Sequence, residues 1–177
     1  MLQKKEMISM LQTFSRQGLK VLQENGSLAP TLFVHTKKDG IISLSLAFLS
    51  SKDSAKQEQF LVVYRKIMQT YHVDFYVIMV EAWRALMSPS DKANGLSANN
   101  MPDRRECANF TMVTKDRAIL TSYQFYRDIN QKVSFVTDGE VIDLTPTRKK
   151  DPILCLLNGK KRMSEKDREE MKILLPI

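Results

Sequence analysis

The stretch VDFYVIMVEAWRAL, residues 73–86, decides the fold. Apart from one aspartate it is apolar up to Val80, which is too continuous a block for a strand with one face in water. A short apolar run bounded by polar residues is typical of a strand covered on both faces. We therefore predict a central strand of a sheet. This strand ends at Glu81, Trp83 and Arg84, where charges and the only tryptophan reach the edge of the core.

Two other segments have the apolar periodicity of helices. Residues 2–24 carry apolar side chains at three- and four-residue spacing, and Asn25-Gly26 supplies a C-terminal stop. Gly18 lies on the apolar stripe, where it costs helicity but allows close packing. A second helix opens at 51–53 and carries a broad apolar face, so it is expected to lie across the sheet.

Strand patterns account for much of the remaining chain. Turn signals at Asp39-Gly40, Lys115-Asp116 and Asp138-Gly139 predict three antiparallel hairpins. The strands that they join are predicted at 31–36 with 41–49, 107–114 with 117–127, and 133–136 with 140–144. Hairpins and helices segregate instead of alternating, which favours an α+β fold with a single antiparallel sheet and helices packed against it. The predicted order is α-β-β-α-β-(long loop)-β-β-β-β-α.

The predicted domain covers residues 1–146, and a basic extension with a short helix covers 147–177. Within the extension, the apolar patch 154–157 is expected to dock back on the domain, and 164–174 is the helix. The segment 87–104 is polar, rich in Ser and Asn, and contains two prolines. A connection this long inside a compact domain is either a binding loop or disordered, and the sequence leaves both open.

The composition is that of a soluble globular protein. The chain has 177 residues, of which 43% are hydrophobic and 27% charged. No apolar run approaches the roughly 20 residues of a membrane span, so no membrane contact is expected. The first ten residues lack the apolar core of a secretory signal. Cys107 and Cys155 lack metal-ligand spacing, so we expect reduced thiols and a cytoplasmic protein.

The formal net charge of +7 raises nucleic acid as a partner. The segment 148–172 holds nine Lys and Arg residues against five Asp and Glu, so it carries four of these seven charges. Two interpretations remain, a solvated tail and a tail that contacts phosphates. The candidate phosphate contacts are Arg148, Lys149, Lys150, Lys160, Lys161 and Arg162.

Motifs that bind phosphates, dinucleotides or zinc are missing from the sequence, and so is a CxxC pair. The only histidines are His35 and His72, which excludes a histidine-rich metal site. We expect His35 to be a hydrogen-bonded structural histidine. A nuclease pattern fails, because Pro102-Asp103 follows Glu81 instead of preceding it. We therefore predict no catalytic residue, no metal and no cofactor.

What remains is a group of charged residues around the long loop. Its members are Glu81, Trp83 and Arg84 where the central strand ends, and Asp103, Arg104, Arg105 and Glu106 where the chain re-enters the sheet. In a structural interpretation, Glu81 pairs with Arg104 or Arg105 and Trp83 covers the core. In a functional interpretation, the same residues form an edge that binds an anion or a partner, with Arg as donor and Trp as stacking surface.

Part of this pattern resembles small uncharacterised proteins of bacterial and phage genomes. The shared features are Glu81-Ala82-Trp83, then Pro89-Ser90 and the PDRRE run at 102–106, followed by a strand and a hairpin. The resemblance covers roughly 28–144 and implies a shared fold and the anchoring of the loop. It implies no activity. The long Ser/Asn loop and the basic tail depart from it.

Three hypotheses follow. The first is a non-enzymatic binding or accessory protein that engages a protein partner through the loop edge or an exposed strand, with self-association through an open sheet edge. The second is a nucleic-acid-associated protein that uses the basic tail. The third is an enzyme with a site around Glu81 and Arg104, which requires an open pocket there.

Overall fold

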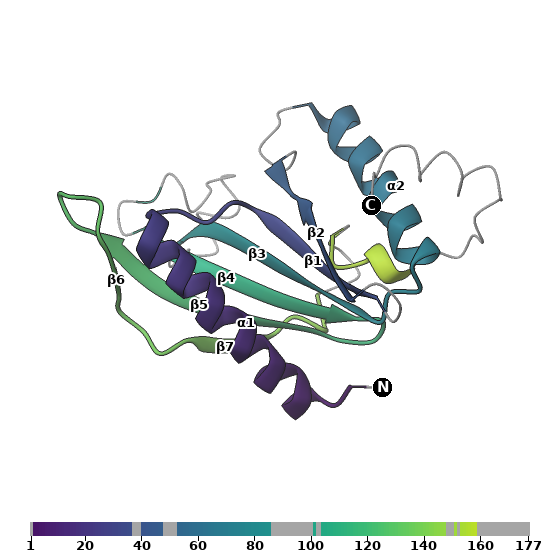
Figure 1. The fold of residues 1–177 in the computed structure, drawn as a ribbon, viewed down its shortest axis with the longest axis horizontal. Helices are drawn as coiled ribbons and strands as arrows, with labels where there is room; N and C mark the ends of the chain where they lie inside the picture. The colour runs from purple at the N-terminus through teal and green to yellow at the C-terminus, as the bar shows by residue number, and fades with distance from the viewer. Residues whose placement is uncertain are drawn as a thin grey trace.

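The computed structural model describes residues 2–36, 40–47, 53–85, 101, 104–147, 151 and 153–158. The predicted fold class is confirmed: the described part is α+β, with one antiparallel sheet of seven strands and helices packed against it (Figure 1). The elements are α1 (Lys4–Asn25), β1 (Thr31–Thr36), β2 (Gly40–Ser45), α2 (Ser54–Thr70), β3 (Phe75–Arg84), β4 (Arg105–Thr114), β5 (Ala118–Arg127), β6 (Val133–Phe135), β7 (Glu140–Asp143) and the 3-10 turn η4 (Leu156–Asn158).

β3 is an interior strand, as its apolar block predicts. The sheet order is β2-β1-β3-β4-β5, and every pairing is antiparallel. Val77 lies opposite Phe33 of β1 and Met112 of β4. Tyr76 and Val77 point to opposite faces, and both are fully buried because each face of the sheet is covered.

The predicted hairpin around Asp138-Gly139 is wrong. β6 and β7 do not pair with each other; both pair with β5, at Phe125 with Phe135 and at Ser122 with Glu140. Residues 136–139 form a bulge between them, so the two strands make one interrupted edge strand along the ten residues of β5. The bulge needs a glycine, because Gly139 has φ +97° and a Cβ there would lie 2.6 Å from the ring of Tyr123.

α1 covers one face of the sheet, across β4, β5 and β6 (Figure 1). Its apolar stripe buries Met7, Leu11 and Leu22 against side chains that include Phe110. Gly18 also lies on this stripe, where the ring of Phe110 would stand 2.4 Å from an added Cβ. The glycine therefore lets helix and sheet approach closely. Gly26, with φ +73°, ends the helix as predicted.

α2 and η4 cover the opposite face. Tyr64 and Ile67 of α2 pack into a second core with Leu32 and Tyr76 of the sheet. Leu154 and Leu156 belong to the same core, which confirms that the apolar patch 154–157 docks back. The predicted terminal helix at 164–174 lies outside the described residues. In the part of the chain that the structure describes, neither helix combines the length and apolarity needed to cross a bilayer.

The first turn of α1 is tied to the edge of the sheet by an ion pair. Lys4 Nζ lies 3.0 Å from Asp143 Oδ2, and the backbone N–H of Thr145 donates to Asp143 Oδ1 at 3.0 Å. Hydrogen bonds from Thr145 and then from Lys4 lower the pKa of Asp143 from 3.8 to about 2. Because the folded-state pKa is the lower one, this stabilisation is present above pH 3.8 and is lost as the pH falls toward 2.

We expect Asp143→Asn to lower the free energy of unfolding at neutral pH by less than about 1 kcal/mol, since the carboxylate is partly exposed. The difference from the wild type should shrink as the pH falls from 3.8 toward 2. Urea unfolding of the wild type and the variant across this pH range measures the difference in the free energy of unfolding. A difference that stays constant over the whole pH range would contradict the assignment.

Candidate functional site

The predicted charged group gathers at one end of the sheet. β3 and β4 are neighbours, so the strands on either side of the long loop meet as expected, with Trp83 opposite Glu106 and Arg84 opposite Arg105. Asp103 lies outside the described residues. The convergence follows from an antiparallel pairing in which one strand ends where the next begins.

The alternation of side chains divides this group between two faces. Glu81 and Trp83 share the α1 face with the buried Met79, whereas Arg84 points to the other face. There Arg84 forms an ion pair with Glu140 of β7. The hydrogen bond and charge of Glu140 raise the pKa of Arg84. Arg84 therefore ties β3 to the edge strand.

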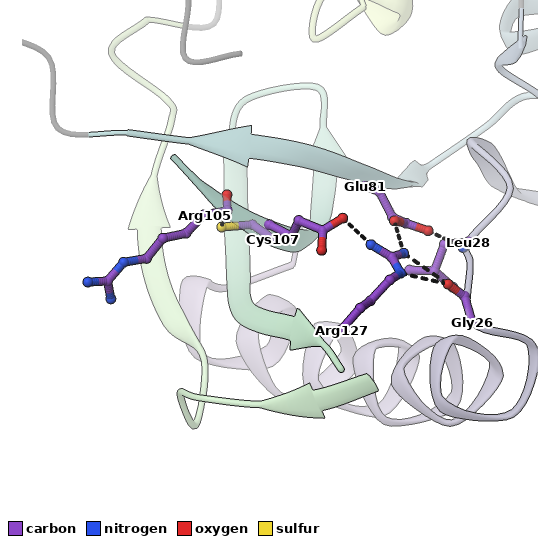
Figure 2. Close-up of polar contacts among 7 residues, drawn as sticks. Gly26, Leu28, Glu81, Arg105, Cys107 and Arg127 are labelled. Carbon is purple, nitrogen blue, oxygen red and sulfur yellow. Dashed lines mark hydrogen bonds and ion pairs between the residues drawn. The ribbon is translucent and has the colours of Figure 1, made fainter. Parts of the chain in front are cut away.

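On the α1 face, Arg127 at the end of β5 lies between two carboxylates (Figure 2). Its Nη2 is 2.6 Å from Glu81 Oε2, and its Nη1 donates to Glu106. The Arg127 side chain is only 16% exposed, so this cluster is largely withdrawn from water. Burial opposes the charge, but the hydrogen bonds to Glu81 and Glu106 outweigh it and raise the pKa of Arg127.

The same cluster holds the chain that leaves α1. The carbonyl of Gly26 accepts from Arg127 Nε at 3.1 Å and from Nη2 at 2.9 Å. The second carboxylate oxygen of Glu81 accepts from the backbone N–H of Leu28. Three strands and the C-terminal end of α1 are therefore joined through one guanidinium (Figure 2).

The predicted pairing of Glu81 with Arg104 or Arg105 is wrong, because Arg127 takes that position. Arg105 belongs to the opposite face and points away from the cluster (Figure 2). The Arg104 guanidinium lies 4.6 Å from the ring centroid of Trp83. Both oxygens of Glu81 accept hydrogen bonds, so this geometry gives no support to a catalytic role for Glu81.

Beside the cluster, the surface forms an open hollow of about 380 Å³. Trp83 is 40% exposed, so it does not cover the core as predicted; it lies at the surface. Tyr126 and Val136 are more exposed still, at 55% and 56%. Among the described residues, the lining consists of Trp83, Arg104, Arg105, Glu106, Gln124, Phe125, Tyr126, Arg127 and Val136.

This lining combines flat aromatic surface with arginine donors. Trp, Tyr and Arg are the residue types that dominate binding energy at protein interfaces. Exposed guanidinium groups bind carboxylates in bidentate geometry, and indole rings stack on flat groups. Glu81 and Glu106 form ion pairs with Arg127. Their carboxylates therefore do not neutralise the positive charge of Arg105.

A larger cavity of about 690 Å³ lies at the other end of the sheet, lined in part by Glu6, His35 and Phe75. The imidazole of His35 stacks on Phe75 with ring centroids 4.6 Å apart. The expected hydrogen bond of this histidine is wrong for Nδ1, which is buried and has no hydrogen-bond partner among the described residues. The carboxylate of Glu6 accepts a hydrogen bond from the backbone N–H of Gln3, the N-cap residue of α1, at 2.6 Å. In the described ranges, no three His, Cys, Asp or Glu side chains are grouped so that they could hold a metal ion.

The candidate phosphate contacts Arg148, Lys149, Lys150, Lys160, Lys161 and Arg162 all lie outside the described residues. Contact with nucleic acid through them stays a prediction.

Comparison with known proteins found no matching family model, no matching curated protein and no matching solved structure. The geometry of the hollow is therefore the starting point for a functional proposal.

Proposed function

We propose that this chain is a non-enzymatic binding protein that engages an acidic segment of a protein partner in the hollow beside Trp83. The observation that carries the proposal is the shared lining of Trp83, Tyr126, Arg104 and Arg105 around one open hollow. The buried thiol of Cys107 is consistent with the reducing cytoplasm as its place of action.

The charges favour an acidic occupant. Arg105 points away from the Glu81–Arg127–Glu106 cluster, and its Nη1 contacts the neutral amide oxygen of Gln124 at 3.3 Å. A carboxylate is a stronger acceptor for a guanidinium than an amide oxygen. An acidic side chain that enters the hollow would therefore replace a weak contact with a bidentate one.

The aromatic residues favour a peptide segment with an apolar or aromatic side chain beside the acidic one. Large apolar side chains at the surface cost solvation and are concentrated where partners bind. Trp83 lies on the α1 face and Tyr126 on the opposite face, so the hollow that both residues line extends around the end of the sheet. The backbone beneath them is held by the Arg127 cluster, so binding needs no reorganisation of the sheet.

Affinity capture with variants of the full chain tests the proposal. We expect Trp83→Ala and Arg105→Glu each to weaken capture of the same protein partner by about tenfold or more. Ile129→Ala is the matched control, because Ile129 is 95% exposed but does not line the hollow. It should leave capture unchanged.

Quantitative mass spectrometry of proteins retained from a lysate of the source cells, treated with nuclease, measures the effect. Partners retained equally by the wild type and both hollow variants would contradict the proposal. Retention that disappears with nuclease and with replacement of the basic residues of the extension by glutamine would favour the nucleic-acid hypothesis instead; these residues are Arg148, Lys149, Lys150, Lys160, Lys161 and Arg162.

A further inference from the structure

β2 is an outer strand whose backbone groups can be assigned to one side or the other. It pairs with β1 at one edge of the sheet (Figure 1). The N–H of Leu46 donates to the carbonyl of Pro30 at 2.8 Å. Backbone groups alternate between the two sides of a strand in an antiparallel ladder. The backbone N–H and C=O groups of the even-numbered residues of β2 therefore point toward β1. Those of Ile41 and Ser43 point away from the sheet.

In the part of the chain that the structure describes, no strand pairs with the outward edge of β2. No hydrogen bond within the described residues reaches the outward groups of Ile41 or Ser43. The Ile41 side chain is 56% exposed. The next outward carbonyl, that of Ser45, accepts from the hydroxyl of Tyr64 and is already occupied. Two N–H and two C=O groups thus form a short unpaired ladder.

The edge also lacks the features that normally prevent pairing with another strand. Such features are charged residues, proline and bulges. The strand GIISLS, residues 40–45, has none of them. The other edge of the sheet differs, since the bulge at 136–139 interrupts it between β6 and β7.

We infer that β2 pairs antiparallel with β2 of a second copy of this chain, so that the two sheets become one. A two-fold axis at Ile42 places Ile41 opposite Ser43 of the second copy, and the unpaired groups then satisfy one another in four hydrogen bonds. A second copy fits this edge because the strand is uncharged: in a chain of net charge +7, it brings no like charges together. This surface is separate from the hollow at Trp83.

Sedimentation velocity of the full chain over a concentration series tests the inference. The wild type should shift from monomer to dimer as concentration rises. Ser43→Pro should raise the dissociation constant roughly tenfold or more, because each copy loses an outward donor and gains a ring at the interface. The substitution spares the ladder with β1, because the N–H of Ser43 points outward. Ser43→Ala keeps the backbone donor and should dimerise like the wild type.

A second variant and a local readout guard against a folding defect. Ile41→Lys keeps every backbone group but places a positive charge near its copy, and it should weaken the dimer more at low salt than at high salt. Hydrogen exchange of the Ile41 and Ser43 amides should slow only at concentrations where the dimer forms. A wild type that is monomeric throughout would overturn the inference. So would a dimer that survives both variants or leaves these amides unprotected.

Discussion

Replacing Arg127 with alanine is expected to lower the free energy of unfolding by about 2–4 kcal/mol. The guanidinium is only 16% exposed and bonds to Glu81, Glu106 and the carbonyl of Gly26. Its removal leaves the carboxylate of Glu106, one oxygen of Glu81 and the carbonyl of Gly26 without this donor in a largely dry site. Breaking such a cluster costs more than losing a surface ion pair, because the remaining charges stay desolvated.

Chemical denaturation followed by circular dichroism measures this loss. Arg16→Ala is the matched control, since Arg16 is exposed on α1 and should change stability by less than about 0.5 kcal/mol. Arg127→Lys should fall between the two, because one ammonium keeps the charge but cannot reproduce the planar fork. An Arg127→Ala protein as stable as the Arg16→Ala protein would contradict a structural role for the cluster.

Gly18→Ala is the second substitution with a large expected effect. In an exposed helix, alanine would stabilise by about 1 kcal/mol relative to glycine. At this position the new Cβ would lie 2.4 Å from the ring of Phe110 and 3.0 Å from the sulfur of Met79. Overpacking typically costs about 1–3 kcal/mol, which exceeds or cancels this gain, so we expect a net loss of stability of up to about 2 kcal/mol.

A double-mutant cycle with Phe110→Leu identifies the cause. If the ring is the obstacle, the double variant should be more stable than the sum of the single changes predicts, by about 0.5–3 kcal/mol. Gln17→Ala, one residue away and exposed, should change stability little. A Gly18→Ala protein that melts above the wild type would contradict the close contact of α1 with β4.

Local patterns predicted the elements whose periodicity is strong. The apolar block before Trp83 identified β3 as interior, because only a strand covered on both faces is apolar on both. The stop at Asn25-Gly26 located the end of α1 to within one residue. The pairing of β6 and β7 could not be predicted this way, because two short strands around a glycine fit both a hairpin and an interrupted edge strand.

The sequence predicted where the charged group lies in the fold, but it did not predict which side chains form ion pairs there. The ends of the long loop meet at Trp83 and Glu106, as expected from neighbouring strands. Arg127 was missed because its role depends on the register of three strands. The turn at Lys115-Asp116 could have indicated this role, because it sets the register of β4 and β5. In that register Glu106 lies opposite Phe125, which is two residues before Arg127. Side-chain alternation then brings Arg127 and Glu106 to the same face.

These pairings divide the end of the sheet into two parts. Glu81, Glu106 and Arg127 stabilise the junction with α1. Trp83 remains exposed on the same face of the sheet, and Tyr126 and Arg105 remain exposed on the opposite face. Stability and recognition should therefore be separable by mutation. Arg127→Ala should act mainly on folding, and Arg105→Glu should act on binding with little change in stability.

A peptide-display selection on the immobilised full chain tests the proposed recognition most directly. A random library is selected on the wild type, and each enriched peptide is then measured against Trp83→Ala and Arg105→Glu. We expect the enriched peptides to carry an excess of Asp and Glu with an apolar or aromatic neighbour, and we expect both variants to weaken peptide binding by about tenfold or more. No enrichment over the starting library, or peptides that bind both variants as tightly as the wild type, would contradict the proposed recognition.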